Sequence, residues 1–182
     1  NPVDVHVEKV KRQAVAVDFV MTRDLAAKVI DATAGSPIGP VVAMALYTGA
    51  RMGELLALHW NDVCLDPALD PRAPYVHVRQ SLTRHEDGSL AFGRPKTEHG
   101  VRRIPLHETA VGLLRELPSH QRGDGPVFPT PRNPDWPYSS SHVFHEMRRC
   151  LATAGLPPLR FHDLRHGAAS LMLADGYELP AV

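Results

Sequence analysis

Arginine and histidine side chains recur in two segments that lie more than a hundred residues apart. Residues 48–56 read Thr-Gly-Ala-Arg-Met-Gly-Glu-Leu-Leu, and residues 162–166 read His-Asp-Leu-Arg-His. His162 and Arg165 are one helical turn apart, so a helix would present both on one face. Two guanidinium groups and an imidazole that converge would suit a phosphodiester that gains negative charge during a reaction.

Arg51 stands at a predicted helix start, directly after the Thr48-Gly49-Ala50 segment. Free backbone amides and the helix dipole favour an anion at such a position. Glu54 follows three residues later, on the same face, and can hold the arginine in place. Taken alone, this pair is equally consistent with a surface ion pair of little energetic value.

Lys96 is one of only four lysines, and it lies in a predicted turn between two strands. A loop lysine is most often simply solvated. An ammonium group presented at the tip of a hairpin can, however, reach into a groove and protonate a leaving oxygen as a general acid. Arg94, Arg102 and Arg103 lie within ten residues of one another around it, and the planar guanidinium suits phosphate. These three arginines are therefore predicted to bind DNA, although the abundance of arginine is also consistent with a GC-rich genome.

A metal site is the competing interpretation of the histidines. His162 and His166 have the i, i+4 spacing of a zinc-protease helix, but Asp163 stands where that motif requires glutamate. His142 and His145 could complete a ligand set, although nothing in the sequence brings them near. A zinc hydrolase that uses His162 and His166 is therefore kept as an alternative.

The composition is that of one folded domain with no excess charge. The 182 residues are 43% hydrophobic, enough for one core, and carry 20 basic and 20 acidic residues. A net charge of zero argues mildly against a nucleic-acid partner, although arginine far outnumbers lysine. Two cysteines are too few for a disulfide framework and suit a reducing cytoplasm. No apolar run is long enough for a membrane span, and no secretory signal opens the chain.

Periodicity and capping residues predict an α+β fold that is mainly helical. Helices are expected over 22–34, 38–47, 51–58, 108–117, 139–154 and 162–174. Alternating residues predict three antiparallel strands over 75–82, 90–93 and 101–106, with a hairpin turn at Asp87-Gly88. The proline-rich stretch 118–137 is expected to be irregular.

The ordered motifs resemble the tyrosine recombinase, or phage integrase, family. Residues 48–63 are similar to the first arginine box, Pro95-Lys96-Thr97 followed by 102–106 resembles the lysine hairpin, and 161–171 resembles the second arginine box. The match covers roughly 22–182 and keeps the family's order. Three ordered motifs are far more specific than any one of them.

The resemblance implies a mainly helical catalytic domain with a small three-stranded antiparallel sheet that clamps duplex DNA. A tyrosine would attack a phosphodiester and form a 3′-phosphotyrosyl link. By position, Arg51 and Arg165 would stabilise the charged phosphorane, Lys96 would protonate the leaving oxygen, and His162 would assist as acid–base. Glu54 would be a supporting residue. No metal or other cofactor is implied, since the arginines supply the positive charge.

The chain departs from the family pattern after the second arginine box. The family's third histidine-or-tryptophan and its tyrosine nucleophile follow that box, whereas here only Tyr177 follows, at a turn between helices. Residues 18–182 are therefore expected to form a catalytic domain that stops before its nucleophile. Residues 1–17 resemble the family's linker and are expected to lead from an absent N-terminal core-binding domain. This chain alone is expected to be a monomer that does not cleave DNA, whereas full-length relatives act as tetramers on DNA.

A non-catalytic DNA-binding remnant of a prophage is the other alternative that the sequence leaves open. All four matched catalytic positions are occupied, which argues against such decay because relaxed selection should have eroded some of them.

Overall fold

The computed structural model describes residues 21–94 and 100–174. Lys96, Tyr177 and residues 1–17 lie outside the described residues. The α-helices in this part of the chain are α1 (Arg23–Ala34), α2 (Gly39–Thr48), α3 (Met52–Leu56), α4 (Glu108–Glu116), α5 (Ser140–Thr153) and α6 (Phe161–Ala174). Two short 3-10 helices are η1 (Trp60–Asp62) and η3 (Pro118–Arg122). No helix within the described ranges is long and apolar enough to cross a membrane.

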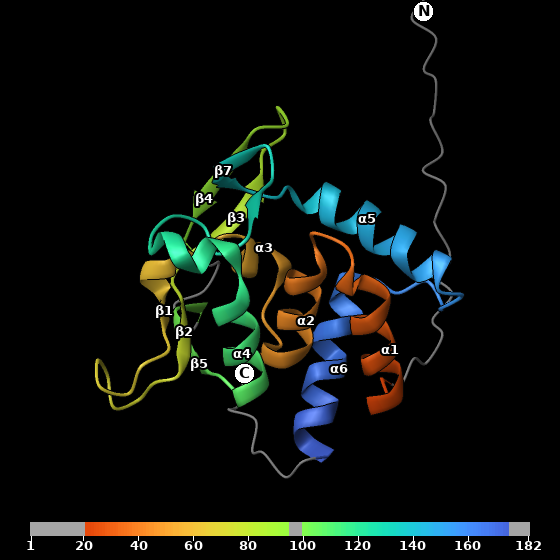
Figure 1. Ribbon diagram of the computed structural model, residues 1–182. Coiled ribbons are helices and arrows are strands. Elements are labelled where there is room, and N and C mark those ends of the chain that lie inside the picture. The colour runs from red at the N-terminus through yellow and green to blue at the C-terminus, as the bar shows by residue number, and fades with distance from the viewer. Residues whose placement is uncertain (1–20, 95–99, 175–182) are drawn as a thin grey trace, which may run out of the picture.

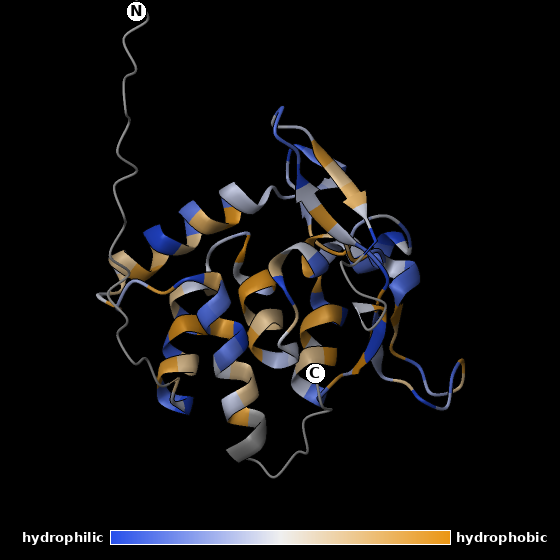
Figure 2. Ribbon diagram, turned by 180° about the vertical axis from the view of Figure 1, so that it is seen from behind, coloured by the Kyte–Doolittle hydropathy of each residue, from blue (hydrophilic) through white to orange (hydrophobic). Residues whose placement is uncertain are grey.

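Helix α2 is the centre of the core. Val41, Val42, Met44 and Ala45 on this helix are fully buried, as expected of a helix that is apolar on every side. It lies among α1, α3, α4 and α6 (Figure 1). The surrounding helices are amphipathic, and Figure 2 shows apolar and hydrophilic segments alternating along them. This packing brings the C-terminal end of α2, which leads into the first arginine segment, beside α6, which carries the second.

The predicted helices agree with the structure because their signals are local. Thr22 caps α1 by accepting a hydrogen bond from the Leu25 backbone amide, at 3.2 Å. Ser139 caps α5 in the same way, accepting from the His142 amide. Gly49 ends α2 with a φ of 62°, a left-handed conformation that suits glycine.

The predicted three-stranded antiparallel sheet is present, but its strands differ from those expected. It consists of β1 (Val63–Cys64), β2 (Tyr75–Val78) and β5 (Arg102–Pro105), in the order β1-β2-β5. The predicted strand 75–82 is wrong as a single element, because it divides into β2 and β3 (Ser81–Arg84). Strand β3 pairs instead with β4 (Leu90–Gly93) in a separate hairpin, which contains the predicted turn at Gly88.

Side chains at the division between β2 and β3 explain why the strand does not continue. The Arg79 Nε donates to Asp62 Oδ1 at 2.5 Å, and the Gln80 amide donates to the Ala57 carbonyl at 3.0 Å. Both bonds hold the chain against the segment that follows α3. The alternation of side chains continues across these two residues, so periodicity alone does not reveal the break.

The stretch 118–137 is more ordered than its prolines suggested. It contains η3 and a hairpin of β6 (Pro129–Thr130) and β7 (Asn133–Pro137). Ser119 Oγ donates to the Val127 carbonyl at 2.7 Å, and the Val127 amide donates to the Leu58 carbonyl at 2.9 Å. Phe128 is buried in the same core as the helices. The expectation of an irregular segment was therefore wrong.

Gly53 allows α3 to pack directly on β3. A Cβ atom at this position would lie 2.5 Å from Ser81 Oγ and 2.7 Å from the Leu82 carbonyl oxygen. The second of these atoms belongs to the backbone, so it cannot move aside without shifting a strand. The close approach fixes the helix that carries Arg51 and Glu54.

We expect Gly53→Ala to lower the free energy of unfolding by about 1–3 kcal/mol, because the methyl group would overpack this contact. Urea unfolding of the two proteins measures the difference. Gly112→Ala is the matched control, because that glycine is exposed on α4 and a Cβ atom added there would meet no atom within 4 Å. The control should gain about 0.5–1 kcal/mol, as for any alanine that replaces a mid-helix glycine. Equal stability of Gly53→Ala and the wild type would contradict the close packing of α3 on β3.

Candidate active site

Arg51 is held at both its backbone and its side chain by Glu54. The Arg51 amide donates to Glu54 Oε2 at 2.9 Å, and its Nη1 donates to Oε1 at 3.1 Å. The Glu54 side chain is only 2% exposed, whereas that of Arg51 is 58% exposed. The buried Glu54 carboxylate therefore fixes the position of Arg51 and leaves the Arg51 side chain accessible at the start of α3.

Arg102 binds the same carboxylate from strand β5. Its Nη2 donates to Glu54 Oε2 at 2.8 Å, and its Nη1 donates to Oε1 at 3.2 Å. This parallel pair of bonds is the strong geometry for arginine and carboxylate. Burial raises the pKa of Glu54, but hydrogen bonds from Arg102 and Arg51 outweigh it and hold that pKa below its ordinary value. Glu54 is thus the charged centre of a cluster with two arginines.

The three arginines expected to bind DNA lie in different environments. Arg102 contacts Glu54, whereas the next residue, Arg103, points to the opposite face of β5. Its guanidinium lies 4.8 Å from the centre of the Tyr75 ring, and its Nη1 lies 3.9 Å from Asp70. Arg94 is exposed and precedes the segment 95–99, which contains Lys96 and lies outside the described residues. The structure therefore brings only Arg102 of these three to the Arg51 cluster.

Arg165 joins the two segments that the sequence singled out. It lies on α6, which packs along α2, and its Nη1 donates to the Gly49 carbonyl at 2.8 Å. Burial is the main cause that lowers the pKa of Arg165 from its ordinary value, followed by repulsion from Arg51 and then, more weakly, from Arg102. Glu54 opposes these effects. Arg165 therefore lies within electrostatic range of the whole cluster.

His162 and His166 form an exposed pair one turn apart on α6. Their Nε2 atoms are 2.9 Å apart, and the rings meet edge to face. Burial, followed by the nearby His166 and Arg165, lowers the pKa of His162. The neutral ring is therefore favoured near neutral pH, and it can accept or donate one proton. This places a proton-transfer group on the same helix as Arg165.

The zinc interpretation finds no support in the part of the chain that the structure describes. Within that part, no group of three or more histidine, cysteine, aspartate or glutamate residues could hold a metal ion. Asp163 caps α6 by accepting from the Arg160 amide at 2.8 Å. His142 stacks on Tyr138 and His145 packs against Phe144, so neither completes a site with His162.

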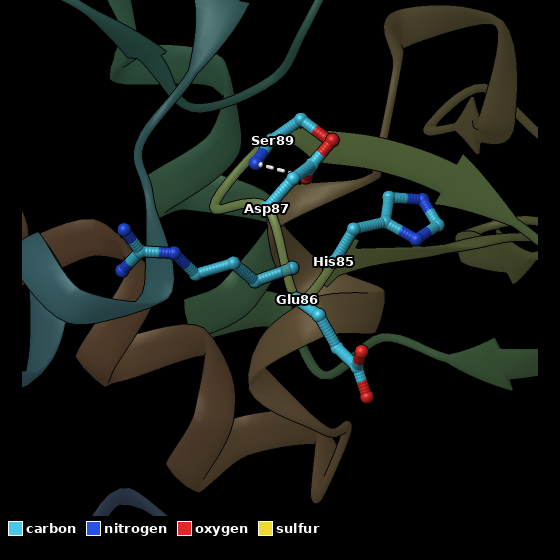
Figure 3. A pocket seen from close by; sticks show the side chains of 5 residues that line it. His85, Glu86, Asp87 and Ser89 are labelled. Atoms are coloured by element: carbon cyan, nitrogen blue, oxygen red, sulfur yellow. Dashed lines mark hydrogen bonds between the residues drawn. The ribbon is translucent and has the colours of Figure 1, made fainter.

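A surface hollow at the β3–β4 turn is not a competing site. It is lined by Arg84, His85, Glu86, Asp87 and Ser89. Figure 3 shows the His85 and Glu86 side chains pointing in different directions rather than toward a common centre. Asp87 instead accepts hydrogen bonds from the Ser89 amide and hydroxyl, which stabilises the turn.

Tyr75 and Tyr138, two of the tyrosines within the described ranges, bond to or pack against residues outside the Arg51 cluster. The Tyr75 hydroxyl donates to Asp70 Oδ2 at 3.0 Å, beneath Arg103. Tyr138 is buried against His142, and burial raises the pKa of Tyr138 and of Tyr47. A raised pKa opposes formation of the phenolate that a nucleophile requires.

These observations agree with comparisons to known proteins. The model of the phage integrase family matches residues 21–182, and the chain belongs to that family. It is 25% identical over 171 residues to a tyrosine recombinase XerC-like protein of Caldanaerobacter subterraneus subsp. tengcongensis, which covers 85% of this chain and 43% of the relative. It is 28% identical over 146 residues to a putative prophage phiRv2 integrase of Mycobacterium tuberculosis, which covers 79% of this chain and 37% of the relative. The chain thus spans less than half the length of these curated relatives.

Solved structures confirm the fold. The Tn1549 transposon integrase in complex with transposon right end DNA has a TM-score of 0.69 at 18% identity, over 88% of this chain and 54% of that one. The catalytic core of lambda integrase has a TM-score of 0.56 at 24% identity, over 86% of this chain and 84% of that one. The α+β fold, mainly helical with a small antiparallel sheet, is therefore the recombinase catalytic-domain fold that the motifs predicted.

The lowered pKa of Glu54 predicts a specific dependence of stability on pH. The pKa of the Glu54 carboxyl is lower in the folded protein than in the unfolded chain, where it is 4.5. Such a group stabilises the folded protein at pH values above 4.5. This contribution is lost as the pH falls through the pKa of the folded state. Glu54→Gln removes this proton linkage. The stability advantage of the wild type over Glu54→Gln should therefore shrink as pH falls below 4.5.

Urea unfolding of both proteins at several pH values between about 7 and 3 measures this difference. Glu116→Gln is the control, because that glutamate is exposed on α4, away from the cluster. A wild-type advantage over Glu54→Gln that stays constant down to the lowest pH would show that the carboxylate is not held by the arginines as described.

Proposed function

We propose that this chain is the catalytic-domain part of a site-specific DNA recombinase, which cleaves and rejoins DNA through a 3′-phosphotyrosyl intermediate. The observation that carries the proposal is that Arg51 and Arg102 both bind the buried carboxylate of Glu54, while Arg165 binds the Gly49 carbonyl two residues before Arg51. Three guanidinium groups and one carboxylate leave an excess of positive charge. Such a cluster suits a phosphodiester whose negative charge grows in the transition state.

Each residue has a definite role in this proposal. A tyrosine hydroxyl attacks phosphorus, the bond to the 5′ oxygen breaks, and Arg51 and Arg165 stabilise the phosphorane between these events. His162 accepts the tyrosine proton, and Lys96 supplies a proton to the departing 5′ oxygen. Glu54 supports Arg51. The arginines provide the positive charge that a metal ion supplies in other phosphoryl-transfer enzymes.

We further propose that the nucleophile belongs to a part of the parent protein other than residues 1–182. Tyr75 and Tyr138 make other contacts, burial raises the pKa of Tyr47, and the sequence around Tyr177 does not match the nucleophile motif. Residues 18–182 would form the catalytic domain, and residues 1–17 would join it to a core-binding domain. The partner would be duplex DNA; the Tn1549 transposon integrase is in complex with transposon right end DNA. The parent protein would work in the cytoplasm as a tetramer on DNA, and this chain alone would be a monomer.

DNA binding by this chain should be weak, sequence-blind and sensitive to salt, since phosphate contacts release counterions. Arg51→Ala or Arg165→Ala should lower affinity and reduce the slope of log Kd against log salt by about one each. Fluorescence anisotropy with a labelled duplex at several salt concentrations measures both quantities. Arg72→Ala is the control, because Arg72 pairs with Asp70 in the loop between β1 and β2. A Kd that changes neither with salt concentration nor on mutation of Arg51 or Arg165 would refute the proposed site.

Covalent chemistry tests the reaction itself. The product of the parent gene, read to its own stop codon, should retain end-labelled nicked DNA from its attachment region after denaturation. Arg51→Ala or Arg165→Ala should slow adduct formation by about 10²- to 10³-fold, as for the loss of one transition-state donor. The 182-residue chain should form no adduct, and an adduct on it would overturn the assignment of the nucleophile. DNA binding without any adduct, on a verified site, would favour a non-catalytic remnant.

A further inference from the structure

We infer that Arg102 is a positioning residue, which orients Arg51 through Glu54 and leaves the charge of Arg51 available to the substrate. The inference rests on the proposed function of the site. It replaces the expectation that Arg102 binds DNA directly. Four features support it: the hydrogen bonds of the Glu54 carboxylate, the limited exposure of Arg102, the charge of the cluster, and the elements that Arg102 connects.

The two arginines together satisfy the Glu54 carboxylate. Oε1 accepts from Nη1 of Arg51 and Nη1 of Arg102, and Oε2 accepts from the Arg51 amide and Nη2 of Arg102. A carboxylate has about four lone-pair sites, so these four donors fill it. Removal of Arg102 would leave two of the sites without a partner in a side chain that is 2% exposed. A buried carboxylate in that state would turn toward other donors or take up a proton.

Arg102 is poorly placed to bind a phosphate itself. Both of its terminal nitrogens donate to Glu54, and its side chain is 29% exposed, half the value for Arg51. In Arg51, by contrast, the bond to Glu54 is made by Nη1, and the guanidinium is largely accessible. Arg102, the less exposed arginine, therefore holds the carboxylate, and Arg51 faces the solvent from which DNA would approach.

Charge gives the arrangement a consequence for the reaction. Arg51 and Glu54 alone would form a neutral pair, and the carboxylate would weaken the attraction between Arg51 and a phosphate. Arg102 supplies a second positive charge in a bidentate bond, which balances Glu54. Glu54 can then fix the position of Arg51 without cancelling its charge.

Arg102 also ties two separate elements together. Its Nη1 donates to the Gly100 carbonyl at 3.2 Å, close to the start of β5, while the same guanidinium binds Glu54 on α3. The sheet and the helix that starts at Arg51 are thus joined through one side chain. A shift of β5 would be transmitted to Glu54, and from there to Arg51.

The test compares Arg102→Met, Arg102→Lys and the control Arg72→Met in the full-length gene product. Single-turnover formation of the covalent adduct with saturating nicked DNA gives the rate constant, and anisotropy gives Kd and its salt slope. We expect Arg102→Met to slow the adduct step by about 10- to 100-fold, as for other residues that orient a reacting group. Its affinity for DNA should fall modestly, because Glu54 is no longer balanced, but its salt slope should stay near the wild-type value because no phosphate contact is lost. Arg72→Met, in the loop between β1 and β2, should react at the wild-type rate.

Arg102→Lys distinguishes a direct contact with a DNA phosphate from a bidentate bond to Glu54. A lysine keeps the charge that a phosphate contact needs, but it lacks the planar fork that binds both carboxylate oxygens. We therefore expect Arg102→Lys to remain slow. Recovery of the rate by lysine, or a loss of affinity with a salt slope lower by about one in Arg102→Met, would overturn the inference in favour of direct DNA contact.

A spectroscopic test on the 182-residue chain separates this inference from the proposed function. Carboxyl ¹³C signals follow the titration of Glu54, and the Arg51 amide signal reports its bond to Oε2. Arg102→Met should raise the pKa of Glu54 and shift the Arg51 amide signal, whereas Arg72→Met should do neither. Unchanged signals would refute the positioning role, even if the wild type forms adducts. Changed signals with no adduct from the wild type would sustain the positioning role and count against the recombinase function.

Discussion

The buried carboxylate of Glu54 is the interaction on which the site depends. A charged group that is 2% exposed loses nearly all of its hydration, and only well-directed donors can offset that loss. The donors come from both arginines, Arg51 beside it at the start of α3 and Arg102 on β5, so the charge can stay buried only while the helix and the sheet are in contact. The fold and the cationic cluster therefore stabilise each other.

Two glycines make that contact geometrically possible. Gly49 turns the chain out of α2 in a left-handed conformation and presents its carbonyl to Arg165 on α6. Gly53 lets α3 approach the backbone of β3 to a distance that no side chain would allow. Both lie within two residues of Arg51. The position of this arginine is thus fixed by local backbone geometry as well as by Glu54, which explains why so short a helix can carry it.

The sequence predicted the helices well because their signals are local, whereas the sheet depends on distant partners. Thr22 and Ser139 act as caps through amides three residues away. The division after Val78 depends instead on Asp62 and Ala57, which lie far earlier in the chain. Similarly, the sequence alone does not show which of the two neighbouring arginines, Arg102 and Arg103, contacts the site. Strand alternation predicts that they face opposite ways, but only the folded chain shows that Glu54 lies on the side of Arg102.

The net charge of zero conceals a local excess of positive charge. Several carboxylates form ion pairs outside the arginine cluster: Asp70 with Arg72, Glu146 with Arg149, Asp163 with Arg160 and Asp62 with Arg79. Those pairs are locally neutral and add little to the field at a distance. The cluster of Arg51, Arg102 and Arg165 contains one carboxylate for three guanidinium groups. A polyanion approaching this face meets that local excess, so the distribution of charge, rather than its sum, decides whether the surface suits DNA.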